Sequence, residues 1–247
     1  MRREVSGSTR IPERPLVEDW SFHDEFGALR FSITQIMSWA SRRHTTLVED
    51  VAYSLMGLLH INMPLLYAEG PNAFFRLQLE VMSKYDDNSL FAWQIPQVSQ
   101  SLGSIRALNR SLEFHGAYWW GSLLAPTIRL FDGCTGHFSY LRSYDHGRSF
   151  SMTNKGILVE GLLRPYGKSR NGDSRWLLLM NCGRNELPTK QLGLVLSVNG
   201  QFAMREVNSQ GFEIDLVDCD IDTESSKKQE FEYRKVYIPQ AWPADFD

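Results

Sequence analysis

Two kinds of hydrophobic spacing divide the chain. Up to about Lys84 the apolar positions recur every three or four residues, which is typical of amphipathic helices. Beyond Trp93 the apolar runs are shorter, and several alternate with polar residues, which favours β-strands. The pattern predicts an α+β fold, with a small unit of about three helices followed by an antiparallel β-rich domain of sandwich or barrel type. The predicted segments are a poorly ordered stretch at 1–30, a helical unit at 31–93, a linker at 94–113, the β-rich domain at 114–240 and a tail at 241–247.

The first predicted helix covers 33–41, with Ser32 as its N-cap and Ile33, Ile36, Met37 and Ala40 on one face. The second is predicted to begin at a capping box. In it the Thr46 hydroxyl accepts a hydrogen bond from the Glu49 amide, and the Glu49 carboxylate reaches back to the Thr46 amide. Asp50 adds negative charge at the same helix end, where the helix dipole favours it. Behind the cap, an apolar stripe is expected to face the core: Val48, Val51, Ala52, Leu55, Leu58 and Leu59.

A tight connection, MPLLYAEG at 63–70, separates the second and third helices. Pro64 biases the residue before it to an extended conformation, and Pro71 suits the first turn of a new helix. That helix is expected to run from about Pro71 to Lys84 and to bury Phe74, Leu77 and Val81.

In the β-rich half, Asn199-Gly200 lies between two strand-like runs and predicts a hairpin whose type I′ turn has positive φ at both residues. A second pair of strands is expected around 153–156, and RWLLLMNC at 175–182 is typical of a strand buried on both faces. The alternation of Phe212, Ile214 and Leu216 predicts a further strand, and 231–239 a closing one.

Composition excludes several function classes. The 247 residues carry a net charge of −3 with scattered Lys and Arg, so no nucleic-acid partner is expected. No apolar run is long enough for a membrane span, and the first fifteen residues lack the apolar core of a secretory signal. Three cysteines without CxxC spacing indicate reduced thiols, which predicts a cytoplasmic location.

The candidate chemistry is sparse. The six histidines form no HxH, HxxxH or HExxH spacing, and a zinc site built from Cys134, His137 and His146 is disfavoured. Cys182 follows an apolar run, where a thiol is inert. No nucleophile elbow or phosphate-binding loop is present, so no catalytic residue, cofactor or metal is predicted. The aromatic run Tyr118-Trp119-Trp120 favours core packing, with a stacking platform for a sugar or a partner as the alternative.

The helical half carries a dense signature, MSWASRRHTTLVEDVAYSLMGLLHINMPLLYAEGPNAFFRLQLEV followed by SLFAW, which closely resembles the end of the HET (heterokaryon incompatibility) region of fungal proteins. LLAP, SMTNKG, LLLMNC and VYIPQ resemble landmarks of the uncharacterised β-rich region that follows it in such proteins. The signature positions, with a structural or interface role expected, are Trp39, Thr46, Glu49, Asp50, Tyr53, Pro64, Leu65, Tyr67, Glu69, Gly70 and Gln78.

Two departures from the signature and one missing segment bear on function. Leu47 replaces the usual Arg, and Ala68 replaces the usual Gly, which predicts that this turn needs no positive φ at Ala68. Residues 1–30 do not resemble the HET core that precedes this stretch in the family, so the core's activity is not expected here.

The resemblance implies a role in fungal nonself recognition and programmed cell death. We expect a non-enzymatic interaction or regulatory module that binds a protein partner or a second copy through the helical unit, because a missing core would leave an apolar face exposed. The alternatives are a ligand- or carbohydrate-binding β domain, and a hydrolase whose carboxylates or histidines converge only in the fold.

Overall fold

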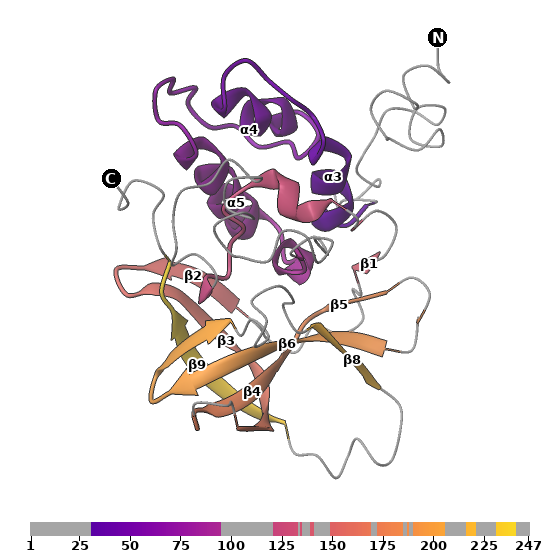
Figure 1. The fold of residues 1–247 in the computed structure, drawn as a ribbon, viewed down its shortest axis with the longest axis vertical. Helices are drawn as coiled ribbons and strands as arrows, with labels where there is room; N and C mark the ends of the chain where they lie inside the picture. The colour runs from indigo at the N-terminus through magenta and orange to yellow at the C-terminus, as the bar shows by residue number, and fades with distance from the viewer. Residues whose placement is uncertain are drawn as a thin grey trace, which may run out of the picture.

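The computed structural model describes residues 31–94, 121–132, 134, 139–140, 149–168, 172–184, 187, 190–205, 216–220 and 231–240. Helices α3 (Ile33–Ala40), α4 (Glu49–Met56) and α5 (Asn72–Lys84) form one layer together with the short 3₁₀ helices η1 (Asn88–Phe91) and η4 (Ile128–Phe131). A mostly antiparallel sheet forms the other layer (Figure 1). The α+β fold class is confirmed.

Local sequence chemistry explains the helices. Ser32 caps α3 with a full capping box that includes Gln35, and the predicted face of α3 is buried. Helix α5 begins at Asn72, one residue after Pro71, and buries its predicted apolar positions. Helix α4 differs from the prediction at its start, as described below.

The main sheet contains β2 (Ser149–Thr153), β3 (Gly156–Lys168), β4 (Ser174–Leu179), β6 (Lys190–Asn199), β7 (Phe202–Arg205), β8 (Leu216–Asp220) and β9 (Glu232–Ile238). A separate two-stranded sheet pairs β1 (Ser139–Tyr140) with β5 (Cys182–Gly183). In the main sheet, β3, β4, β6, β7 and β9 pair in a closed ring, because β9 contacts β3 on one side and β7 on the other. The barrel-type expectation is therefore correct, although the β7–β9 pairing that closes the ring is parallel.

The predicted hairpin is present, but its turn is shifted by one residue. Asn199 pairs with Phe202 as the last pair of the ladder, so the loop is Gly200-Gln201. Gly200 has a φ of 63°, whereas Asn199 is a strand residue and Gln201 has no positive φ. The type I′ prediction, with positive φ at both Asn199 and Gly200, was therefore wrong. The extended β6 strand keeps Asn199 in the ladder, so the glycine alone supplies the left-handed residue.

One hydrophobic core runs through both layers. It joins residues of α3, such as Ile33, to strand residues such as Ile238 without a break. Alternate residues of β6 divide between this core and a smaller cluster around Leu177 and Val195 on the other face of the sheet. Position 193 of β6 requires glycine, because the Cβ of any other residue there would come within 2.7 Å of the Leu177 side chain.

Buried polar side chains join the two layers where the backbone is irregular. Gln78 of α5 accepts from the Ala125 amide (2.9 Å) and donates to the Ala125 carbonyl (2.8 Å). Asn181, which follows β4, exchanges side-chain-to-backbone hydrogen bonds with Asn88 of η1. Arg205 of β7 donates to the carbonyls of Phe91 (2.8 Å) and Trp93 (2.8 Å). We call these contacts the layer seam.

The layer seam predicts a large effect of Gln78→Met on stability. The side chain is completely buried, and its loss leaves both the N–H and the C=O of Ala125 without their partner. We expect the free energy of unfolding to fall by about 2–4 kcal/mol in denaturant titrations. Gln191→Met is the matched control, because Gln191 is about equally buried but its amide nitrogen makes no hydrogen bond within the described part of the chain. An equal loss in the two variants would contradict this role for Gln78.

Candidate functional site

The connection at 63–70 folds back on α4 and is held there by the carboxylate of Glu49. This side chain is buried at the first position of α4 and accepts a hydrogen bond from the Gly70 amide at 3.0 Å. Backbone amides of Glu49 itself, Gly70 and Ala68 donate to the carboxylate and lower the pKa of Glu49 below its usual 4.5. The Glu49 carboxylate thus acts as a hydrogen-bond acceptor for the backbone of the turn.

The predicted capping box at Thr46 was wrong. Helix α4 starts at Glu49 with Val48 as its N-cap, and no side-chain hydrogen bond caps it. Thr46 and Val48 are exposed, so Val48 does not join the core-facing stripe as expected, whereas Ala52, Leu55 and Leu59 do. The physical reason is that the Glu49 carboxylate binds the distant turn instead of reaching back to Thr46.

Tyr53 fixes the middle of the connection. Its hydroxyl accepts from the Leu66 amide (2.8 Å) and lies within donating distance of the Leu66 carbonyl (2.7 Å) and the Glu69 carboxylate (2.9 Å). Removal from water raises the pKa of Tyr53, and the hydrogen bond to Glu69 raises it further. Arg76 of α5 donates to the Pro64 carbonyl (2.6 Å) and lies 3.3 Å from the Glu69 carboxylate. Helices α4 and α5 therefore both bind the turn through its backbone.

Tyr67 lies over the first turn of α4. Its hydroxyl is 3.3 Å from the Asp50 carboxylate, whose negative charge raises the pKa of Tyr67. The Tyr67 ring contacts the Tyr53 ring edge to face, at 5.6 Å between centroids. Asp50 thus orients an aromatic side chain that is itself more than half exposed.

These contacts leave apolar side chains on the outside. Leu65, Leu66 and Tyr67 of the turn, with Leu47 and Val48 at the start of α4, are each between 47% and 56% exposed. We call these five residues the apolar cluster. The turn is linked to the segment before α4 through Asp50, whose carboxylate lies 3.3 Å from the Tyr67 hydroxyl and whose amide donates to the Leu47 carbonyl at 3.2 Å. Exposed apolar residues grouped on a rigid turn are typical of an interaction surface.

Ala68 has a φ of +71°, so the prediction that this turn needs no positive φ there was wrong. The conformation is imposed by the fixed neighbours, because Glu69 is held by Tyr53 and Arg76, and Gly70 by Glu49. Gly70 also has a positive φ, +57°, and glycine adopts this left-handed conformation without strain. Ala68 has a Cβ and is strained in the same conformation.

Two further signature positions, Trp39 and Gln78, are buried. Trp39 is buried and packs edge to face on Phe31, with 5.1 Å between ring centroids. Gln78 belongs to the layer seam, and the carbonyl of Pro64 accepts from Arg76. The structure thus brings Glu49, Asp50, Tyr53, Glu69 and Gly70 together around one turn, and it leaves Trp39 and Gln78 elsewhere. Thr46 instead lines a cavity.

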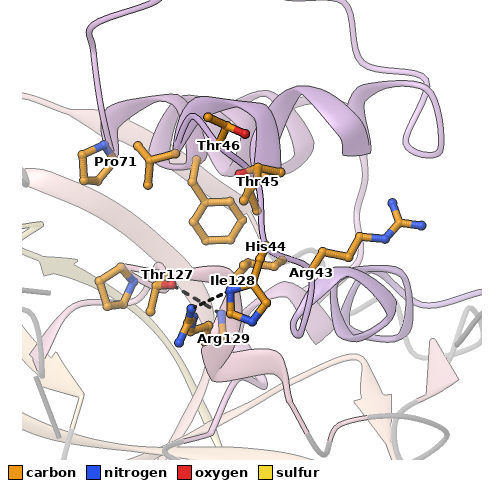
Figure 2. A pocket seen from close by; sticks show the side chains of 12 residues that line it. Arg43, His44, Thr45, Thr46, Pro71, Thr127, Ile128 and Arg129 are labelled. Carbon is orange, nitrogen blue, oxygen red and sulfur yellow. Dashed lines mark hydrogen bonds between the residues drawn. The ribbon is translucent and has the colours of Figure 1, made fainter. Parts of the chain in front are cut away.

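The cavity is bordered by the segment before α4, by α4 itself, by the start of α5 and by residues 126–129 at the start of η4, and it has a volume of about 230 Å³ (Figure 2). Arg129 donates to Nδ1 of His44 at 3.3 Å across its mouth, and the Arg129 amide donates to the Thr127 hydroxyl at 3.4 Å. Figure 2 shows these three residues side by side, while the Arg43 guanidinium points away from the cavity. The lining comprises Arg43, His44, Thr45, Thr46, Val48, Val51, Pro71, Phe74, Pro126, Thr127, Ile128 and Arg129.

The remaining candidates from the sequence take part in neither feature. Cys134 and Cys182 are buried, and burial raises the pKa of the Cys134 thiol to about 12. His137, His146 and the aromatic run 118–120 lie outside the described residues, as do Phe212 and Ile214. Within the described residues, no cluster of three His, Cys, Asp or Glu could hold a metal ion, and no helix is long and apolar enough to cross a bilayer.

Sequence reasoning missed three residues that organise these features. Arg76 lies within the HET-type signature quoted above, in the stretch FFRLQ, so the signature offered a signal for it. Arg129 and Arg205 carried no signal, because their partners lie 85 and 112 to 114 residues away along the chain.

Comparison with known sequences agrees with the resemblance to fungal HET-region proteins. The family described as "Domain of unknown function (DUF8212)" matches residues 72–241. The chain is 32% identical to "Vegetative incompatibility protein HET-E-1" of Podospora anserina over 164 residues. These aligned residues make up 65% of this chain. The match spans 11% of the length of that relative. No solved structure matches.

The lowered pKa of Glu49 predicts an acid-sensitive turn. Because the folded pKa is below the usual 4.5, the stabilisation is complete above pH 4.5 and is lost as pH falls through the folded pKa. Glu49→Gln should therefore lower the melting temperature at pH 7, and the difference from the parent chain should shrink towards pH 3. Thermal unfolding at several pH values measures this. Glu80→Gln on the exposed face of α5 is the control, and a difference that stays constant with pH would contradict the assignment.

Ala68→Gly should stabilise the protein by about 0.5–1 kcal/mol, because the strain of an L-residue at positive φ exceeds the entropic cost of glycine. Denaturant unfolding measures the change. Ala73→Gly, within α5, is the opposite control and should destabilise by about 1 kcal/mol or more. A loss of stability in Ala68→Gly would mean that the turn does not need a left-handed residue.

Proposed function

The chain belongs to the DUF8212 family, and we propose that it is a non-enzymatic interaction module of a HET-type vegetative incompatibility protein. The similarity to "Vegetative incompatibility protein HET-E-1" supports this proposal, as does the dense HET-type signature at 37–81. In this proposal the module acts in the cytoplasm and takes part in nonself recognition that ends in programmed cell death.

The observation that carries the proposal is the apolar cluster on a rigid turn. Leu65, Leu66 and Tyr67 are exposed although the backbone beneath them is bound by Glu49, Tyr53 and Arg76. Holding the turn in one conformation costs stability at Ala68, so the turn is fixed more strongly than a connecting loop requires. A pre-ordered apolar surface loses little conformational entropy when it binds, which favours a protein partner or a second copy of the chain.

The polar signature residues support a non-enzymatic role. Glu49 and Gln78 each bind backbone groups of the protein itself, and the Tyr53 hydroxyl is engaged by the Leu66 amide. Their hydrogen-bonding capacity is spent on the fold, so they do not supply a free base or nucleophile at the turn.

The proposal predicts association through the apolar cluster. Two measurements test it: sedimentation velocity of the chain over a range of concentrations, and calorimetric titration with the segments of HET-E-1 that flank the matched region. We expect association in at least one of them, and we expect the double variant Val48→Ser/Leu65→Ser to weaken it at least tenfold, because burial of these side chains drives binding.

Met204→Ser is the matched control, because Met204 is 57% exposed but belongs to strand β7 and not to the apolar cluster. A chain that stays monomeric and binds neither segment would overturn the proposal. Equal weakening by Met204→Ser and the double variant would also overturn the assignment to the apolar cluster.

A further inference from the structure

Asp50, which links the turn to the segment before α4, carries a negative charge that no cation balances. Its Oδ1 lies 3.3 Å from the Tyr67 hydroxyl, and its amide donates to the Leu47 carbonyl at 3.2 Å. The side chain is partly exposed, and within the described part of the chain no Lys or Arg pairs with it. Its second oxygen, Oδ2, makes no hydrogen bond there either. The carboxylate can therefore accept a further hydrogen bond from a charged donor.

The other charges around the turn leave this excess in place. Glu69 and Arg76 form an ion pair at 3.3 Å and neutralise each other. Glu49 is buried and accepts hydrogen bonds from backbone amides, so its charge is held by dipoles and not by a cation. The charge of Asp50, removal from water and the charge of Glu49 all raise the pKa of Tyr67. The exposed Tyr67 therefore lies in a negative potential.

A carboxylate beside an exposed aromatic ring matches an arginine. The guanidinium can donate to the carboxylate while its flat face lies on the ring, which a lysine ammonium does less well. Tyr67 is 56% exposed, so part of its ring is available for this contact. The chain contains the same combination on the sheet, where Arg234 lies 3.9 Å from the ring centroid of Trp176 and 3.1 Å from the Glu232 carboxylate.

We propose that the apolar cluster binds a protein segment that presents an arginine between apolar residues. The arginine would donate to Asp50 and stack on Tyr67, and its apolar neighbours would cover exposed side chains such as Leu65. This inference rests on the proposed interaction role of the cluster and names the chemistry of its partner. A second copy joined cluster to cluster is disfavoured, because two negatively charged surfaces would meet without a cation.

The test titrates the full chain with three peptides, followed by NMR. The peptides have the sequence acetyl-SQLLXLLQS-amide, with arginine, citrulline or glutamate at X. Citrulline has nearly the shape of arginine without its charge, so it separates the charge from the apolar contact. We expect saturable binding of the arginine peptide, tighter than the citrulline peptide by about fivefold or more, and weaker binding of the glutamate peptide than of either. Added salt should reduce the arginine preference by screening.

Variants locate the contact. Asp50→Asn should abolish the preference for arginine over citrulline and leave the affinity for the citrulline peptide unchanged, because asparagine keeps the shape and loses the charge. Glu232→Gln on β9 is the matched control and should leave all three affinities unchanged, since that carboxylate is already paired with Arg234. Thermal melts establish that each variant is folded.

Several results would overturn the inference: no saturable binding of the arginine peptide, equal affinity for the arginine and citrulline peptides, or an unchanged arginine preference in folded Asp50→Asn. A dimer of the chain that the double variant Val48→Ser/Leu65→Ser disperses would also overturn it. That dimer would nevertheless support the proposed function, as would binding of a HET-E-1 segment that is insensitive to Asp50→Asn. Failure of the inference is thus distinct from failure of the proposed function.

Discussion

The arrangement of the two layers depends on satisfying backbone polar groups where the chain is neither helix nor strand. The segments around η1 and before η4 are buried between α5 and the sheet, so their amides and carbonyls have no regular ladder to join. Gln78, Asn181 and Arg205 supply the partners from helix, sheet end and strand respectively. An unpaired buried peptide group costs on the order of 1–3 kcal/mol, so each of these side chains constrains where the layers can sit.

Of these three side chains, Arg205 has the largest cost of burial, because removal from water lowers its pKa and opposes its positive charge. Its guanidinium stacks at 3.9 Å from the centroid of Trp93 and donates to two carbonyls of the same segment. The attraction to the indole face and to the carbonyl dipoles offsets part of the desolvation cost. Trp93 in turn donates to the Leu123 carbonyl, so one cation orders both irregular segments.

Local signals in the sequence predicted the elements whose stability is decided locally. Ser32 and Gln35 sit three residues apart and form the capping box, and Gly156 pairs with Thr153 across the short turn between β2 and β3. The failures at Thr46 and Ala68 have a common cause. Both were judged from neighbouring residues, yet Glu49 is committed to Gly70, twenty-one positions away, and that contact decides the start of α4 and the backbone of the turn.

The density of the signature follows from this arrangement. A surface loop usually turns polar side chains outward, but here polar side chains from α4 and α5 point at the turn backbone, and the turn's own apolar side chains point outward. Every polar group must then match a specific amide or carbonyl, which restricts residue type as strictly as catalysis would. Residues such as Glu49 and Tyr53 are therefore specified by the shape of the turn they hold, and the outer surface of that turn is formed by Leu65, Leu66 and Tyr67, whose side chains are half exposed or more.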